Sequence, residues 1–449
     1  MATAYERKRL ENIRRNGEMM AALNVHAKAS LLSAATAAKR PRRDESKSFN
    51  KQKKTEPIVI RQSQRTRGFT PDSAGLPYQS SHCPKPRRKS LAPVPFDVAY
   101  EGENSHTQFV DSLLSCNVVV NREDPDSVEF GLESLSLEPH NVARVVPGKI
   151  LVAKFLPCEN VKMVAAGDVR GSVGFWNLDS ENEEDDGIYL FSPHTASVSS
   201  LVFQQNSFSR VISSSFDGFI RLMDIDKLVF DLVYSTDEAI YSLSQRPNDE
   251  QSLYFSEGTG MFKIWDLRAG KSFFQWDLHN YRIETIDFNP LNPHVMATSS
   301  LDRTACLWDL RSIGANKPKT LRTVKHSRAV HSAYFSPSGL SLATTSRDNY
   351  VGILSGPNLE STSMIYHNNQ TERWISNFRG VWGWDDSHIF IGNLSKKIDV
   401  ISTELKRTVM ALQNPLMKDI PCKIHCHPHN VGMLAGSTAE GQVYVWTTM

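Results

Sequence analysis

The chain has 449 residues, of which 40% are hydrophobic and 22% are charged, so it can form a sizeable packed core. Its net charge is +2, no apolar run approaches the roughly 18 residues of a membrane helix, and the charged N-terminus lacks the apolar stretch of a secretory signal. Six cysteines without a Cys-X-X-Cys pair do not form a disulfide framework and suggest a reducing compartment. Composition therefore argues against membrane and disulfide-rich secreted proteins.

Residues 1–90 form a basic arm with 21 Lys/Arg and 7 Asp/Glu. Residues 4–23 have the apolar spacing of a charged helix, and the rest of the arm is poor enough in apolar residues to be disordered. Two basic runs resemble a bipartite nuclear localisation signal and predict a nuclear protein. The residues of this signal are Lys39, Arg40, Arg42, Arg43, Lys51, Lys53 and Lys54. The arm predicts an anionic partner, and a solvated tail is the alternative.

Residues 91–139 form an acidic connector with 1 Lys/Arg and 10 Asp/Glu. Residues 140–449 are nearly balanced, with 29 Lys/Arg and 32 Asp/Glu. The small net charge of the whole chain thus hides a basic arm, an acidic connector and a nearly neutral body. Such asymmetry is typical of proteins whose arm meets an anionic partner.

The body, residues 140–449, repeats a short strand at a regular interval. Equivalent positions are 176, 223, 265, 308, 354, 400 and 446, with a mean spacing of 45 residues. A propeller blade of four short strands takes about 40–45 residues. We therefore predict an all-β, seven-bladed propeller. The last blade ends after three strands, so the strand at 141–147 is expected to complete it and close the ring.

The repeats resemble the WD40 family over about residues 140–449. The resemblance rests on the blade period, on a turn Asp and on Trp-Asp at the anchor strand, as in VMATSSLDRTACLWDLR (295–311). It implies a buried network of a His, a hydroxyl, an Asp and a Trp. In the fourth blade these are His279, a hydroxyl within 298–300, Asp302 and Trp308. Such a satisfied network stabilises the fold.

Other histidines and cysteines favour structural roles. His194 and His326 match the structural His position of this resemblance. The run 422–429 is rich in Cys and His, but side chains of a strand alternate between two faces, which separates the cysteines from His425 and His427. We expect no metal and no cofactor. No nucleophile with a base, phosphate-binding glycine loop or paired carboxylates stands out, so we expect no enzyme.

The loops between blades and the turns before the anchor strands share one face of a propeller. These loops carry a basic residue at seven consecutive positions, which predicts a positive rim that tracks DNA phosphates. Trp374, beside Gln370, is either a wedge that probes base stacking or a buried core residue. The predicted DNA-binding residues are Arg170, Arg282, Arg303, Arg328, Arg347, Gln370, Arg373, Trp374, Lys396 and Lys418.

Further motifs extend the resemblance to the arm. YERKRLENIRRNGEMMAAL, RQSQRTRG, NFRGVWGWDD and KKIDVIS resemble the WD repeat-containing protein 76 family. This resemblance implies a damage-responsive DNA-binding protein, related to damaged-DNA-binding protein 2, whose DNA-probing hairpin corresponds to 368–374. The boxes ending in Arg268 and Arg311 resemble those of receptors that dock on the cullin-4 ligase adaptor, which implies that both arginines bind the adaptor.

Together these features predict a nuclear DNA-binding scaffold that is linked to the DNA damage response and serves as a substrate receptor for a cullin-4 ubiquitin ligase. The expected partners are double-stranded DNA or chromatin and the ligase adaptor, with histones as a further candidate and no membrane. The alternative is a protein-interaction propeller that reads a histone or another peptide and does not bind DNA directly.

Overall fold

The computed structural model describes residues 11, 14, 15, 90–102, 105–116, 131–180, 186–204, 207–311, 317–371 and 374–448. The chain divides into two compact units, Met1–His82 and Cys83–Met449. In the first unit the described residues Glu11, Arg14 and Arg15 are helical. The basic residues of the predicted nuclear localisation signal lie outside the described residues.

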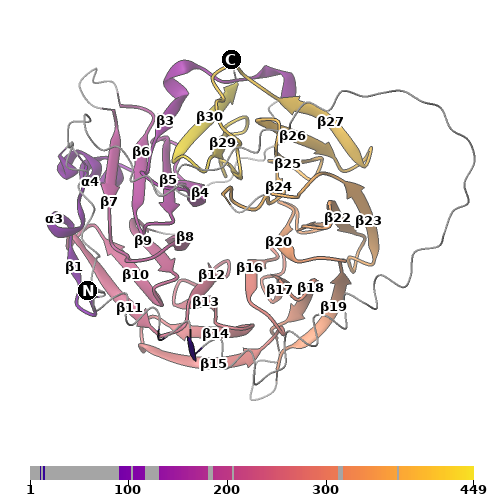
Figure 1. Cartoon of the computed structure of the whole chain (residues 1–449), viewed down its shortest axis with the longest axis horizontal. Helices are drawn as coiled ribbons and strands as arrows, with labels where there is room; N and C mark the ends of the chain where they lie inside the picture. Colours follow the sequence, from indigo (N-terminus) through magenta and orange to yellow (C-terminus); the bar gives the residue numbers. More distant parts are fainter. Residues whose placement is uncertain are drawn as a thin grey trace, which may run out of the picture. The chain divides into compact units, whose positions relative to one another are not determined.

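The second unit is a ring of antiparallel sheets. Within its described residues the strands form seven sheets of four or five strands, arranged around a central axis (Figure 1). The seven-bladed propeller predicted from the repeat spacing is confirmed. In the described ranges, no helix is both long and apolar enough to span a membrane.

Each blade is a meander whose first strand lies nearest the ring axis (Figure 1). Blade 1 contains β4 (Ile150–Phe155), β5 (Met163–Asp168), β6 (Val173–Asn177) and β7 (Ile188–Phe191). Blade 2 contains β8 (Val198–Gln204), β9 (Ser207–Ser215), β10 (Phe219–Asp224) and β11 (Val229–Ser235). Blade 3 contains β12 (Ile240–Ser244), β13 (Ser252–Glu257), β14 (Met261–Asp266) and β15 (Lys271–Asp277).

The remaining blades follow the same order. Blade 4 contains β16 (Ile283–Phe288), β17 (Val295–Ser300), β18 (Thr304–Asp309) and β19 (Lys319–Lys325). Blade 5 contains β20 (Val330–Phe335), β21 (Leu342–Ser346), β22 (Tyr350–Ser355) and β23 (Ser361–Tyr366). Blade 6 contains β24 (Val381–Trp382), β25 (His388–Asn393), β26 (Lys397–Ser402) and β27 (Arg407–Leu412). Blade 7 contains β28 (Lys423–Cys426), β29 (Leu434–Ser437) and β30 (Gln442–Thr448).

The outer position of blade 7 is filled by chain that precedes the ring. β3 (Val142–Arg144) pairs with β30, with Val142 opposite Tyr444. β2 (Leu135–Ser136) pairs with the end of the same strand, and the short 3-10 turns η3 (Leu132–Ser134) and η4 (Pro139–Asn141) flank it. Closing the ring in this way leaves no free edge at β30.

A second segment of the acidic connector packs on blades 1 and 2. β1 (Val94–Pro95) pairs with β11 as a fifth strand of blade 2. The helices α3 (Phe96–Ala99) and α4 (His106–Leu114) bury Phe96 and Phe109 in the cluster that joins the two blades. The buried Arg221 of β10 donates hydrogen bonds to the carbonyl oxygens of Ser90 and Ala92, which fixes the start of this segment.

The hydrophobic core lies between the blades. Among the described residues there are seven buried clusters, and each draws its members mainly from two neighbouring blades. Between blades 3 and 4, for example, Tyr254 and Phe262 pack with Phe288 and Trp308. Each blade therefore buries its two faces only because both neighbours are present.

Candidate functional site

A hydrogen-bonded chain inside blade 4 matches the network that the WD40 resemblance implies. His279 Nδ1 lies 2.8 Å from Asp302 Oδ2, and His279 Nε2 lies 2.7 Å from Thr298 Oγ1. The indole Nε1 of Trp308 donates to the same Thr298 oxygen at 2.8 Å. The expected hydroxyl is thus that of Thr298. The chain ties the loop before β16 to the turn before β18.

The carboxylates of the turn aspartates Asp217 and Asp302 accept hydrogen bonds inside the propeller. Burial alone would raise the pKa of Asp302, but hydrogen bonds from His279 and Thr304 outweigh it and hold the pKa at about 2. The same balance, with His194 as the main partner, holds the pKa of Asp217 at about 2. These carboxylates stay ionised and serve the fold, so the outward charge of this face depends on other residues.

The Cys- and His-rich run near the C-terminus is part of the core. Cys422 and His427 are buried, and His425 Nδ1 accepts a hydrogen bond from the backbone N–H of Phe155. Burial lowers the pKa of His425 to about 3, which keeps this imidazole neutral. In the part of the chain that the structure describes, no group of three or more His, Cys, Asp or Glu is placed to hold a metal ion.

Five exposed cations lie in loops and turns on the loop face between blades 4 and 7. We call these residues the basic arc: Arg303, Arg328, Arg347, Lys396 and Lys418. The turns before β18, β22 and β26 hold three of them, and the loops that lead into β20 and β28 hold the other two. The loop between β23 and β24 separates Arg347 from Lys396 and contributes none of these five residues.

The other predicted DNA-binding residues divide into four groups. Arg170 is exposed but lies on blade 1, apart from the arc. Arg282 is half-buried, and its Nε donates to Glu284 Oε1 at 2.6 Å, so its charge is partly offset. Gln370 is exposed, and Trp374 is 57% exposed, which assigns this indole to the surface and not to the core. Arg373 lies outside the described residues.

The loop face is not uniformly basic. On blades 2 and 3, all loops and turns of this face are described, and they contain no Lys or Arg. They carry instead the exposed Asp237 and Glu238 between β11 and β12. The face therefore has a basic side and an acidic side.

The backbone of the arc has an unusual conformation. The turn before the third strand places one residue in the left-handed region, and blades 1, 2, 3 and 7 use glycine there. Blades 4, 5 and 6 use Arg303 at φ 75°, Asn349 at φ 69° and Lys396 at φ 60°. A side chain in this region costs about 1 kcal/mol or more relative to glycine. Arg303 and Lys396 thus present charged side chains at a turn position where four other blades have no side chain.

Exposed aromatic rings accompany the arc. Tyr281 is 60% exposed beside Arg282, and Tyr366 ends β23 with 67% exposure. Together with Trp374 they add exposed aromatic rings to the face that carries the arc, a combination that suits nucleic-acid bases. Sequence reasoning missed both tyrosines, although the signal was visible as an aromatic residue where a strand meets a basic loop.

A cavity of about 270 Å³ lies where the first strands converge, and it is lined on one side by Thr371 and by the segment 374–380 that leads into β24. This segment spans the channel, because Ser376 Oγ donates to the carbonyl oxygen of Ile150 in blade 1 and Arg379 Nη2 donates to that of Glu284 in blade 4. Sequence reasoning missed three cations that line this cavity: Lys149, Arg379 and Lys423. These three residues share one feature of the sequence: each lies at or just before the first strand of a blade.

The opposite face carries the two arginines assigned to adaptor binding. Arg268 follows β14 and Arg311 follows β18, so they occupy equivalent positions on neighbouring blades, and both are exposed. Arg311 Nη2 lies 2.6 Å from Asp309 Oδ2. Arg268 and Arg311 are brought together on one face, away from the arc.

The sequence is similar to those of known WD-repeat proteins. The family profile "WD domain, G-beta repeat" matches residues 187–224, 270–309 and 318–353. WD repeat-containing protein 76 of Mus musculus is 27% identical over 468 residues, covering 98% of this chain and 74% of the mouse protein. The chain is a homologue of these WD-repeat proteins.

Two further relatives match nearly the whole of this chain. WD repeat-containing protein 76 of Xenopus laevis is 26% identical, covering 98% of this chain and 80% of the frog protein. DNA damage-binding protein cmr1 of Neurospora crassa is 26% identical over 515 residues, covering 98% of both chains. The similarity thus includes the basic arm and the propeller, as the motifs of the arm suggested.

Proposed function

We propose that the protein is a nuclear scaffold that binds duplex DNA in connection with DNA damage. The observation that carries the proposal is the left-handed conformation of Arg303 and Lys396 on the basic arc. Four other blades use glycine at this turn position, so the charged side chains of Arg303 and Lys396 support a role in phosphate contact. Phosphate contacts from such cations give DNA affinity without sequence preference.

Three further observations support this proposal. The arm of residues 1–90 has an excess of basic residues. The exposed rings of Tyr281 and Trp374 lie in loops of the same face as the arc. A relative that matches 98% of the chain bears the name DNA damage-binding protein cmr1. Nuclear residence follows as part of the same proposal, since chromatin is the partner.

A salt titration tests the proposal. We expect the full chain to bind duplex DNA with an affinity that falls steeply as salt rises, because each neutralised phosphate contributes about −0.9 to the log–log slope. The slope is measured by fluorescence anisotropy of a labelled duplex. A variant that lacks residues 1–90 should keep a shallower but clearly negative slope, which is the share of the remaining chain. A slope near zero for both proteins would refute DNA binding.

We further propose that the face opposite the arc recruits the adaptor of a cullin-4 ligase. Arg268 and Arg311 support this because they are exposed at equivalent positions of neighbouring blades, where two guanidinium groups suit acidic partner side chains. With DNA on one face and the adaptor on the other, the propeller would bring a ligase to chromatin.

The double variant Arg268→Ala/Arg311→Ala tests adaptor recruitment. We expect it to lower the recovery of purified adaptor in a pull-down several-fold, because a charge-assisted hydrogen bond contributes about 1.5–3 kcal/mol. DNA binding should be unchanged, since neither residue lies on the loop face. Arg144→Ala, at an exposed arginine of β3, is the control. Equal recovery of adaptor by all three proteins would exclude these arginines.

The acidic side of the loop face favours a second candidate function. Asp237 and Glu238 would suit a basic peptide such as a histone tail. A propeller that only reads such a peptide would show no salt-dependent DNA binding, so the titration above separates the two functions.

A further inference from the structure

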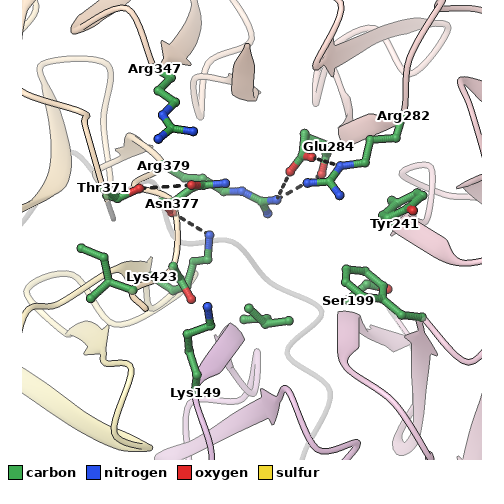
Figure 2. Close-up of a pocket in the computed structure, with 14 residues that line it drawn as sticks. Lys149, Ser199, Tyr241, Arg282, Glu284, Arg347, Thr371, Asn377, Arg379 and Lys423 are labelled. Atoms are coloured by element: carbon green, nitrogen blue, oxygen red, sulfur yellow. Dashed lines mark hydrogen bonds and ion pairs between the residues drawn. The ribbon is translucent and has the colours of Figure 1, made fainter. Parts of the chain in front are cut away.

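The cavity in the central channel has an excess of positive charge. Its lining includes five cations, which converge from several blades (Figure 2): Lys149, Arg282, Arg347, Arg379 and Lys423. Of the described residues that line it, Glu284 is the only carboxylate. Glu284 pairs with Arg282 at 2.6 Å and with Arg379 at 3.6 Å. One carboxylate therefore serves two guanidinium groups, while two lysines and a third arginine face the same space.

Two of these cations are buried where a bound anion would stabilise their charge. Lys423 is only 8% exposed, and its Nζ donates to the carbonyl oxygen of Asn377 at 2.8 Å. Burial, with Arg379 nearby, lowers the pKa of Lys423 well below its usual range. The buried Nε of Arg379 has no hydrogen-bond partner among the described residues. Buried cations of this kind are stabilised when an anion joins them.

The donors suit a tetrahedral oxyanion better than a planar one. Figure 2 shows Lys149 and Lys423 extending from one side of the cavity and Arg347 from the opposite side, with Arg379 between them. A phosphate group presents oxygens in several directions and accepts from both lysine and arginine. A single carboxylate presents only two oxygens in one plane, so it meets fewer of these donors than a phosphate group does.

We propose that this cavity binds a phosphate group. The group belongs either to a small phosphate compound or to a nucleic acid, and both present the same chemistry to these cations. The site goes beyond the DNA contacts of the basic arc, because small phosphate compounds would bind in the channel even if the arc bound no DNA. It also gives the segment 374–380 a role, since Asn377 and Arg379 form one wall of the site.

Isothermal titration of the full chain with pyrophosphate at constant ionic strength tests this site. We expect saturable binding, with acetate giving none. Lys423→Met and Lys149→Met should each raise the dissociation constant roughly tenfold or more, as expected for one lost charge-assisted contact. Lys271→Met, which removes an exposed lysine of β15, should bind like the original protein. Thermal melts of all variants verify folding.

A 5′-phosphorylated oligonucleotide added as competitor then distinguishes the two sources. Displacement of pyrophosphate assigns the site to nucleic-acid phosphate, and no displacement assigns it to a small phosphate compound. Absence of saturable binding overturns the proposal, as does equal affinity of both cavity variants and the original protein for pyrophosphate. Neither result affects DNA binding by the arc, which the salt titration measures separately.

Discussion

Replacing Arg303 and Lys396 together by glycine should weaken DNA binding and leave the fold intact or more stable. Both residues hold a left-handed conformation that glycine adopts without strain. Losing two phosphate contacts should reduce the magnitude of the salt slope by roughly 1.8, at about 0.9 for each contact. The slope is measured by fluorescence anisotropy, and the melting temperature by calorimetry.

Asn349→Gly is the matched control for this double variant. Asn349 occupies the same turn position in blade 5, with φ 69°, but carries no charge. Asn tolerates this conformation better than Arg or Lys, and Asn349 Oδ1 accepts from the backbone N–H of Asn369, so this substitution should relieve less strain. It should leave the salt slope unchanged. If Arg303→Gly/Lys396→Gly binds DNA with the slope of the original protein, the arc is not the DNA contact and the conformations of these residues need another explanation.

Replacing Thr298 by valine should destabilise the propeller more than any change on its surface. With His279 Nδ1–H donating to Asp302, the Thr298 hydroxyl donates to His279 Nε2 and accepts from Trp308. Valine has a similar volume and no hydroxyl, so both partners would be left buried and unsatisfied. Each such group costs about 1–3 kcal/mol, so we expect a loss of about 2–5 kcal/mol.

Calorimetry of three variants measures this effect. Thr298→Val should lower the melting temperature by roughly 4–10 °C, and Thr298→Ser, which keeps the hydroxyl, should recover most of the loss. Thr320→Val on the exposed edge of β19 provides the same chemical change without the network and should have little effect. Equal melting temperatures for the two valine variants would mean that the chain of hydrogen bonds contributes little to stability.

Much of the propeller was predictable because its blades repeat. The interval between anchor strands predicted seven blades, and the WD40 resemblance of the repeat implied the contact of Asp302 with His279. Exposed residues of tight turns, such as Arg303 and Lys396, were predictable for the same reason.

Features that depend on contacts between distant segments were not predictable. Lys423 reads as an ordinary strand residue, and only the convergence of several blades places it in a cavity with Lys149 and Arg379. The connector was interpreted from its acidic charge alone. That interpretation overlooked Phe96 and Phe109, two apolar residues that pack on blades 1 and 2. Sequence patterns show which residues repeat, but not which segments meet across the ring.

The pairing of β3 with β30 has a consequence for how the protein is made. Val142 pairs with Tyr444, so about 300 residues separate the two halves of the closing blade. Ribosomes add about 5–20 residues per second, so β3 waits about 15–60 s for its partner strand. During this interval the core faces of the first and latest blades lack their final neighbour. Each new chain therefore passes through a stage in which the ring is open and apolar faces of its blades are exposed. Chaperones have time to bind these faces before the ring closes.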